Sequence, residues 1–503
     1  MVTKTFTVAF DGMEGRLVEV QCLVSDGMPA FSIVGLPDKA VSEARDRVRA
    51  TLEAMGMMLP AKKITLNLSP ADLPKQGSHF DLPIALALMG ELNVVARDEL
   101  ENTLSMGELS LDGRLMPVAG ALPAAVVAAA EGLTMLCPAR VGPEAAWVAS
   151  VAVYAPETML QTIDHLSHRK ELPRAIAGEV IEDQRVRDLS EVKGQARAKR
   201  ALELAAAGRH HLLMTGAPGA GKSMLASCLP GILPPLSPKE ALETAMIQSL
   251  AGNLPEGGIS KIRPFREPHH TASMAAIAGG GRNALPGEVS LAHNGVLFLD
   301  ELPEFARNVL ETLRQPIETG EVVVARANAH VRYPCRFLLV AAANPCRCGY
   351  LLNPSRACSK APVCGAEYLG RISGPLMDRF DLRIEVPEMR WQELEQSAGG
   401  ETSADVAARV LKARDVQTKR YEGHPDVRVN ADAEGRLLEE IATPDAEGRA
   451  VLAKAADRFG LSARAYHRIL RVARTLADLE GAPDVGKRHV LEAVGYRIAY
   501  QTS

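Results

Sequence analysis

HHLLMTGAPGAGKS, residues 210–223, is the stretch of sequence that decides the fold. Its apolar residues Leu212 to Met214 predict a short buried parallel strand, and the following SMLASCL predicts a helix. Between them lies G-x-x-x-x-G-K-S, in the strand–loop–helix context that a phosphate-binding loop requires. The alternative is a chance glycine-rich turn, which the agreement of strand, loop and helix disfavours.

The loop predicts a nucleoside triphosphate site. The residues expected to hold the phosphates are Gly216, Ala217, Pro218, Gly219, Ala220, Gly221, Lys222 and Ser223. The glycines let backbone N–H groups turn toward a polyphosphate, and the next helix points its positive N-terminus at the same anion. Lys222 is expected to reach the terminal phosphates, and the Ser223 hydroxyl to bind Mg²⁺. The expected ligands are therefore ATP and Mg²⁺.

Composition limits the classes of protein to consider. A chain of 503 residues predicts two to four domains, and 47% hydrophobic with 23% charged residues is ordinary for a soluble globular protein. The net charge of −4 means that any contact with nucleic acid must come from local patches. Only 4% of residues are aromatic, which argues against a base-stacking platform.

The location of the protein is also predicted from composition. No apolar run approaches the roughly 18 residues of a membrane helix, and the N-terminal MVTKTFTVAF lacks the apolar core of a signal peptide. We therefore expect a cytoplasmic protein without a membrane partner. Its eight cysteines should be reduced or metal-bound rather than bridged.

Two further apolar runs end in polar side chains that suit hydrolysis. GVLFLDE, residues 295–301, predicts a strand whose tip carries Asp300 to hold Mg²⁺ and Glu301 to act as base on the attacking water. RFLLVAAANP, residues 336–345, predicts a strand that closes on Asn344. If that strand lies between the other two, Asn344 sits beside the γ-phosphate. The alternatives are an ordinary strand end and an asparagine that caps a strand before proline.

Three N-terminal stretches carry a family resemblance. GLPDKAVSEARDRVRA (35–50), NLSPADLPKQGSHFDLPIALALM (67–89) and GELSLDGRLMPVAGALPAAV (107–126) resemble the ComM/YifB family of magnesium-chelatase-like proteins. The resemblance implies an S5-like domain of the kind shared with Lon proteases. Lon uses a Ser–Lys pair, but the lysine position here is Leu122 and the serine position falls near Asp81, while Ser78 has no evident base. We expect a scaffold or partner-docking domain rather than a protease.

The same resemblance extends to the middle and end of the chain and implies an AAA+ ATPase. Asn344 matches the sensor-1 position, Arg379 matches the arginine finger supplied by a neighbouring subunit, and Arg464 matches sensor 2, which reaches back to the phosphates. A finger acting between subunits implies a homo-oligomeric ring, usually a hexamer. For both arginines the alternative is a surface charge. Arg468, Arg471 and Arg474 on the same helix are interpreted as surface or helix-dipole charges.

Two insertions bear on the substrate. Residues 252–292 resemble the helix-2 insert of this AAA+ branch, with FRxPHHTAS and GGG signatures, and His269 and His270 are interpreted as core or interface histidines rather than metal ligands. Residues 318–333 predict a hairpin whose side chains Arg326, His330 and Arg332 could grip a DNA backbone in a central pore. A plain surface hairpin with solvated charges is the alternative.

A cysteine cluster follows sensor 1. Cys346, Cys348, Cys358 and Cys364 lie in a loop containing glycine and proline, and four thiolates this close in sequence suit a tetrahedral Zn²⁺ site. The family commonly carries a similar insert, so the resemblance implies a structural zinc. The alternative is four unconnected thiols.

The resemblance covers essentially the whole chain. The fold class it implies is α/β: an AAA+ P-loop core with a helical lid, preceded by an S5-like, Lon-protease-like α+β domain. The expected ranges are 1–165 for the S5-like domain, 166–188 for a linker, 189–388 for the core and 389–503 for the lid. The implied activity is an ATP-driven helicase that moves on single-stranded or branched DNA and promotes branch migration in natural transformation. Remodelling of a protein partner, as by the magnesium-chelatase ATPase subunit, and Lon-like proteolysis are the rival hypotheses.

Overall fold

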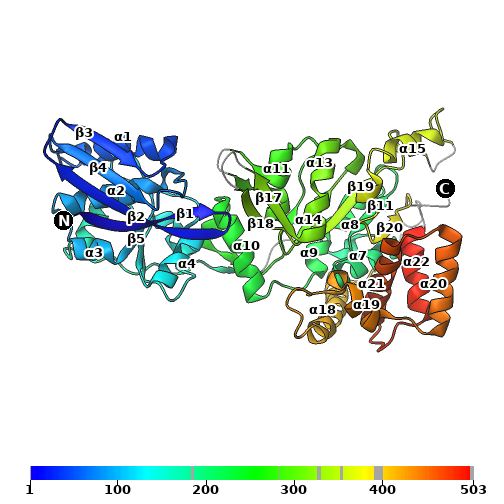
Figure 1. The fold of residues 1–503 in the computed structure, drawn as a ribbon. Coiled ribbons are helices and arrows are strands. Elements are labelled where there is room, and N and C mark those ends of the chain that lie inside the picture. The colour runs from blue at the N-terminus through cyan, green and yellow to red at the C-terminus, as the bar shows by residue number, and fades with distance from the viewer. Residues whose placement is uncertain are drawn as a thin grey trace.

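The structure is a computed structural model that describes residues 2–182, 186–281, 284–325, 330–351, 355–389 and 400–498. Three regions follow one another along the molecule, with the N-terminal region at the end opposite the C-terminal helices (Figure 1). None of the helices in these ranges has the length and the apolar composition needed to cross a bilayer.

A seven-stranded mixed sheet forms the N-terminal region, in the order β3-β4-β2-β1-β5-β8-β9. Side chains of its long strands alternate between the core and the other face, as the period of two along a strand requires. The apolar helix α2 packs between the sheet and α1. The elements are β1 (Thr3–Asp11), β2 (Glu14–Ser25), β3 (Ala30–Val34), α1 (Lys39–Ala54), β4 (Lys63–Ser69), α2 (Asp81–Glu91), α3 (Arg97–Glu101), β5 (Thr103–Ser105), β6 (Glu108–Leu109), β7 (Leu115–Met116), α4 (Ala121–Glu131), β8 (Thr134–Leu136), α5 (Gly142–Ala145), β9 (Val153–Tyr154) and α6 (Met159–Leu166).

The positions compared with the Lon dyad have structural contacts. Asp81 is buried and accepts two hydrogen bonds from the Arg47 guanidinium, at 2.5 and 2.8 Å. The Ser78 hydroxyl donates to the Glu108 carboxylate, and the Leu122 side chain is fully buried. Ser78 therefore has an acidic partner that the sequence did not reveal, and neither Asp81 nor Leu122 supplies the Ser–Lys pair that Lon uses.

The N-terminal region docks onto the middle region through α4 and α10 (Pro238–Leu250). The Gly120 amide at the start of α4 donates to the Ser249 carbonyl at 3.1 Å, and the Trp147 indole donates to the Gly257 carbonyl at 2.6 Å. Leu122 joins Ala241 and Ala245 of α10 in one small buried apolar cluster. The residue that replaces the Lon lysine is therefore part of the interface between the two regions.

A five-stranded parallel sheet organises the middle region, in the order β13-β16-β19-β11-β20. Its strands are β13 (Phe265–Arg266), β16 (Val296–Leu299), β19 (Leu338–Ala343), β11 (Leu212–Thr215) and β20 (Leu382–Glu385). β19 lies between β16 and β11, which is the order that the predicted place of Asn344 assumed. Because all five strands run the same way, their carboxyl ends share one edge of the sheet and their amino ends share the other.

Short helices and two small hairpins surround this sheet. They are α7 (Ala196–Gly208), α8 (Lys222–Ser227), α9 (Leu229–Ile232), α11 (Met274–Ala278), β14 (Gly279–Gly280), β15 (Leu285–Pro286), α12 (Glu288–Leu291), α13 (Arg307–Thr312), α14 (Arg314–Thr319), β17 (Glu321–Ala325), β18 (His330–Pro334), α15 (Val363–Leu369) and α16 (Gly374–Met377). The connecting segment contributes β10 (Val180–Ile181), which pairs with β12 (Ile259–Ser260). That pairing fixes part of the predicted linker against the core.

Helices form the C-terminal region. They are α18 (Ser403–Arg420), α19 (Gly435–Ala442), α20 (Ala446–Phe459), α21 (Ala463–Leu479) and α22 (Lys487–Ile498). α18 and α21 pack against α7, and α22 packs against β20, so that their apolar faces join the core of the parallel sheet in a single buried cluster. In Figure 1 these helices lie below and beside the sheet, away from the N-terminal region.

Candidate functional site

The phosphate-binding loop joins the end of β11 to the start of α8. Gly219 and Gly221 have φ angles of 78° and 89°, a left-handed conformation that glycine adopts without steric cost. Gly216 also needs its missing side chain, because a Cβ there would lie 2.2 Å from the Val386 carbonyl oxygen. The glycine pattern thus follows from the shape of the loop.

Lys222 is buried and folds back into this loop. Its Nζ donates to the carbonyls of Gly216 and Ala217 at 2.7 and 2.9 Å, and to Asn344 Oδ1 at 3.1 Å. Burial lowers the pKa of Lys222, while Asp300 and Glu301 oppose that change. The ammonium group therefore lies between the loop and the tip of β19, where the sequence predicted the terminal phosphates.

Asp300 meets Ser223 at the same edge. Ser223 Oγ donates to Asp300 Oδ2 at 2.6 Å, and the other carboxylate oxygen of Asp300 accepts the Glu301 amide at 2.9 Å. A hydroxyl and a carboxylate are oxygen donors that Mg²⁺ prefers, and an adjacent triphosphate would supply more. These two side chains fit a resident Mg²⁺.

Glu301 has an unusual backbone. Its φ is 52°, in the left-handed region that a residue with a side chain rarely adopts, and such conformations concentrate at functional sites. The carboxylate is half exposed, and its Oε2 lies 3.4 Å from His270 Nδ1. This geometry leaves the carboxylate open to a water molecule with an imidazole beside it.

His270 and Glu267 are residues that the sequence argument did not assign to this site. Both belong to the FRxPHHTAS signature, which was the available signal. His270 stacks edge-on against Phe305 and faces Glu301, while burial and the nearby Asp300 raise the pKa of Glu267. The helix-2 insert thus contributes to the nucleotide edge.

Arg379 lies at the opposite edge of the sheet. It precedes β20, whose first residue, Leu382, pairs with Leu212 at the start of β11. The four residues of β11 span about 13 Å, so Arg379 is separated from its own phosphate-binding loop by the length of the strand. The guanidinium is 4% exposed, donating to the Pro375 carbonyl at 2.5 Å and pairing with Glu318.

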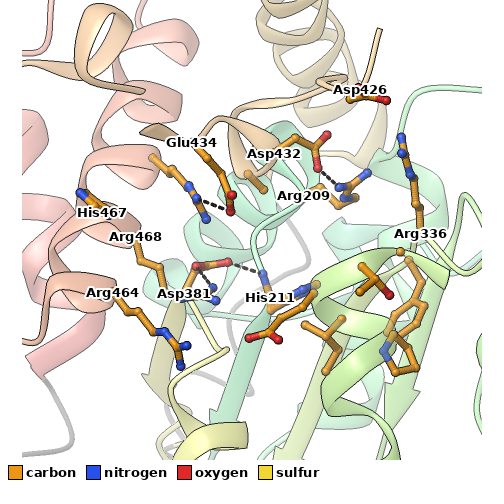
Figure 2. Close-up of a pocket in the computed structure, with 18 of the residues that line it drawn as sticks. Arg209, His211, Arg336, Asp381, Asp426, Asp432, Glu434, Arg464, His467 and Arg468 are labelled. Carbon is orange, nitrogen blue, oxygen red and sulfur yellow. Dashed lines mark hydrogen bonds and ion pairs between the residues drawn. The ribbon is translucent and has the colours of Figure 1, made fainter. Parts of the chain in front are cut away.

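Arg464 lies at this same edge. It lines a cavity of about 670 Å³ with Arg209, His211 and Asp381, which all adjoin the amino ends of β11 and β20 (Figure 2). Arg464 therefore faces away from its own loop, and it does not reach back to the phosphates of its own subunit as the sensor-2 resemblance implied. The reason is that Arg464 lies on α21, whose Arg468 is paired with Asp381 just before β20, at the amino ends of β20 and β11.

Asp381 holds this edge together. Arg468 Nη1 donates to Asp381 Oδ1 at 2.6 Å, and the His211 amide donates to Oδ2 at 3.1 Å (Figure 2). Burial opposes ionisation, yet Arg468 and the His210 ring hold the pKa of Asp381 well below its usual range. Arg468 also donates to the Arg379 carbonyl at 2.9 Å, so the C-terminal helix α21 is bonded to the segment that carries Arg379.

The interpretation of the α21 arginines as surface charges is wrong. Arg468 makes the contacts just described, the Arg471 side chain is 12% exposed and donates to the Ala433 carbonyl at 2.7 Å, and Arg474 is buried with its guanidinium on Asp478. Helical periodicity did not reveal Asp381, which lies 87 residues away in sequence, and it did not show that the Arg474–Asp478 pair within α21 is buried.

The hairpin β17–β18 lies on the side of the core that faces the N-terminal region (Figure 1). Arg326 and the side chain of His330 lie outside the described residues. Arg332 is described, with a side chain that is 75% exposed and lies 3.9 Å from Glu321. A Cβ at Gly12 would lie 2.6 Å from the Arg332 carbonyl oxygen, so the β1–β2 turn sits directly on β18.

The four loop cysteines come together in two pairs. The Sγ atoms of Cys346 and Cys348 are 3.0 Å apart, and those of Cys358 and Cys364 are 3.4 Å apart. The Cys346 thiol and the Tyr350 amide lower the pKa of Cys348 to about 7. Across the ranges that the structure describes, no set of three or more His, Cys, Asp or Glu side chains has the arrangement of a metal site. The zinc therefore stays a prediction.

Comparison with protein-family models gives three matches along the chain. They are magnesium chelatase, subunit ChlI, over residues 188–394; subunit ChlI of Mg-chelatase over residues 18–140; and the magnesium chelatase subunit ChlI C-terminal model over residues 400–497. The first model ends at residue 394 and the third begins at residue 400, so the boundary between them falls between β20 and α18.

Curated relatives extend over the full chain. The competence protein ComM of Haemophilus influenzae is 44% identical over 494 residues, covering 97% of this chain and 95% of the relative. The uncharacterized protein YifB of Salmonella typhimurium is 42% identical over 487 residues, with 97% and 95% covered. The magnesium-chelatase 38 kDa subunit of Rhodobacter capsulatus is 26% identical over 330 residues, which is 60% of this chain and 83% of the subunit.

Proposed function

The chain belongs to the ComM/YifB family of magnesium-chelatase-like AAA+ proteins, and on that basis we propose that it is a ring-forming, Mg²⁺-dependent ATPase that moves on DNA. Membership of this family implies ATPase activity. Assembly into a ring, movement on DNA and helicase activity go beyond what family membership implies, and they are the parts that we propose.

The proposal of a ring is supported by the positions of the site residues at opposite edges of the parallel sheet. Lys222, Asp300, Glu301 and Asn344 lie at the carboxyl edge of the parallel sheet, and the arginines lie at the amino edge. A single subunit cannot bring both edges to one nucleotide. A neighbour in a head-to-tail ring can, because it presents its amino edge to the carboxyl edge of the next subunit.

The residues then take separate roles. Bound Mg-ATP supplies an electrophilic phosphorus and a metal ion that offsets the charge on the phosphate oxygens. Ser223 and Asp300 would hold the metal ion, and Lys222 would exchange its loop carbonyls for phosphate oxygens. Glu301 is placed to accept the proton of the attacking water, Asn344 to orient that water, and Arg379 of a neighbouring subunit to stabilise the transferred phosphoryl group.

A subunit-mixing experiment tests the ring. We expect Lys222→Ala and Arg379→Ala each to lose nearly all ATPase activity in homogeneous preparations. Mixed rings should regain part of the activity, since an Arg379→Ala subunit keeps an intact loop that a Lys222→Ala neighbour can complete with its own finger. Mixtures that exchange subunits but stay inactive would contradict a finger that acts between subunits.

The DNA part of the proposal is supported by the hairpin. Arg332 is exposed on β18, whereas Val322 and Val331 of the same hairpin pack into the core. An exposed cation on a hairpin can contact phosphates without reading a base sequence. The name of the relative ComM refers to competence, which agrees with a role in handling transforming DNA.

Forked and branched DNA test this part. We expect both to stimulate the ATPase and to be unwound or branch-migrated by the wild-type protein. An intact ATPase without stimulation or unwinding would overturn the helicase proposal and favour remodelling of a protein partner, the role suggested by likeness to the magnesium-chelatase subunit. Parallel casein digestion tests proteolysis, which we do not expect.

The zinc prediction forms a separate proposal. Four thiols in one loop are a donor set that fits Zn²⁺, and pairing by 3.0 and 3.4 Å contacts already brings them together. Elemental analysis of purified protein should give about one zinc per chain. A double variant, Cys346→Ser with Cys348→Ser, should lose it, whereas Cys22→Ser in the N-terminal core should retain it.

A further inference from the structure

Arg379 is held back within its own subunit. Both terminal nitrogens of its guanidinium are engaged, Nη1 by the Pro375 carbonyl at 2.5 Å and Nη2 by the Glu318 carboxylate. Its Nε is buried, with no hydrogen-bond partner among the described residues, and the residue as a whole is 4% exposed. Both terminal nitrogens are thus bound within the subunit, and the 4% exposure leaves little of the residue accessible from outside.

Glu318 differs from Arg379 in its exposure. Its side chain is 52% exposed, and it lines the 670 Å³ cavity at the edge where Arg464 lies. A triphosphate presented by a neighbouring subunit at this edge would meet the Glu318 carboxylate first. The two anions repel each other, and both compete for the same guanidinium, which binds carboxylate and phosphate with similar geometry.

The position of Glu318 in the chain connects Arg379 to the hairpin. Glu318 lies in the last turn of α14, which ends at Gly320 and continues directly into β17. The Thr319 hydroxyl donates to the Glu321 carbonyl at 3.0 Å, and the Cys335 amide after β18 donates to the Gly320 carbonyl at 2.8 Å. Both strands of the hairpin are thus hydrogen-bonded to the end of α14, next to the residue Glu318.

We infer that Glu318 is a positioning residue that holds Arg379 withdrawn and releases it toward the neighbouring active site when the hairpin binds DNA. This inference rests on the proposed function, which supplies the ring and the DNA. It adds a way for one subunit to make its neighbour's ATP hydrolysis depend on DNA binding. Release transfers the guanidinium from a carboxylate to a phosphate, and no covalent bond changes.

The test compares Glu318→Gln with the wild type in the full-length protein. Removing the charge should raise the ATPase rate without DNA about fivefold, the size expected for loss of one partly exposed ion pair. The rate with forked DNA should change little, so the ratio of stimulated to unstimulated rates should fall toward one. The gain should disappear in the double variant Glu318→Gln, Arg379→Ala, because it acts through the finger.

Glu311→Gln is the matched control. Glu311 lies on the neighbouring helix α13 and accepts a hydrogen bond from Arg314 at 2.8 Å, and within the described part of the chain it makes no hydrogen bond or ion pair with Arg379. We expect both rates to match the wild type. Ring size is measured for each variant by native mass spectrometry, so that a change in rate is compared at equal assembly.

Failure of the Glu318 inference and failure of the proposed DNA function would give different results. If DNA stimulates the wild type and Glu318→Gln leaves both rates unchanged, or lowers them in parallel with the melting temperature, the inference is wrong. If DNA stimulates neither protein but Glu318→Gln still hydrolyses ATP faster, the withdrawn finger stands and the coupling to DNA fails. Should Glu318→Gln not fold, Glu318→Asp is tested instead, because it retains the charge on a shorter side chain. This variant should raise the ATPase rate without DNA by a smaller factor. If the rate does not rise, the inference is overturned.

Discussion

Asn344 Oδ1 accepts a hydrogen bond from Lys222 Nζ at 3.1 Å, which joins the tip of β19 to the phosphate-binding loop. The two residues are 122 positions apart in sequence, and adjacent parallel strands bring them together. The strand order therefore holds the ammonium group at the edge where phosphates are expected. Four predictions follow from this edge, the opposite edge and the hairpin.

Glu301→Gln should bind ATP with near wild-type affinity and hydrolyse it about 100-fold or more slowly, because the amide cannot accept a proton from water. Nucleotide binding is measured by fluorescence of a labelled ATP analogue, and turnover by phosphate release. Glu304→Gln, three residues further on and paired with Arg371, is the control and should keep its activity. Equal activity in Glu301→Gln and wild type would exclude Glu301 as the base.

Arg464→Ala should leave ATP binding by isolated subunits unchanged and lower the ATPase of assembled rings at least about tenfold. The reason is its position at the amino edge, where it can meet only a neighbour's nucleotide. The same mixing assay used for Arg379 checks this, with Lys222→Ala as the partner variant. Loss of ATP affinity in the isolated Arg464→Ala subunit would show instead that the arginine acts within its own chain.

Asp381→Asn should destabilise the protein by about 2 kcal/mol at pH 7, because the buried Asp381 carboxylate accepts a charge-assisted hydrogen bond from Arg468 that a neutral amide accepts more weakly. The pKa of Asp381 in the folded protein is held well below its ordinary value of 3.8. A lowered folded pKa contributes stability that is complete above the unfolded pKa and is lost as the pH falls through the folded pKa. The difference between wild type and variant should therefore shrink below about pH 4.

Chemical unfolding at pH 7 and at about pH 2.5, below the unfolded pKa of an aspartate, measures this difference. Asp426→Asn is the control, since Asp426 lines the same cavity without an ion pair to Arg468 and should unfold like the wild type at both values. A constant difference across the pH range would mean that the charge of Asp381 is not the source of its contribution.

Arg332→Ala should weaken binding to forked DNA and reduce DNA-stimulated ATPase several-fold, while the rate without DNA stays near that of the wild type. The exposed side chain makes a 3.9 Å contact with Glu321 but is not packed, so its removal should not affect folding. Fluorescence anisotropy at two salt concentrations measures the binding. Arg436→Ala on α19 removes an equally exposed charge and serves as control; a similar loss in that variant would point to net charge rather than to the hairpin.

The sequence predicted the nucleotide edge well for a physical reason. Each of Lys222, Asp300 and Asn344 directly follows its own short apolar strand or loop, so local periodicity fixes which end of the strand carries the side chain. Parallel pairing then brings these ends together. The arrangement of β19 between β16 and β11 is the one step that local sequence did not supply, and the structure confirms it.

The opposite edge could not be predicted in the same way. The contact of Arg468 with the buried Asp381 and the pairing of Arg379 with Glu318 join residues from separate elements. The position of His270 beside Glu301, at the carboxyl edge, does the same. A surface arginine and a buried one have the same place in a helical period, because periodicity reports the face of a helix and not what packs against that face. The sequence argument accordingly placed Arg468 at the surface.

The sequence by itself determined that this chain has a phosphate-binding loop on a parallel sheet, with acidic and amide side chains at the strand ends, because those features depend on neighbours in the chain. Only the tertiary structure decided which edge of the sheet Arg464 faces. That depends on where the C-terminal helices pack, and they pack against α7 and β20 through apolar contacts between residues hundreds of positions apart. The direction of one arginine thus follows from the burial of many distant side chains.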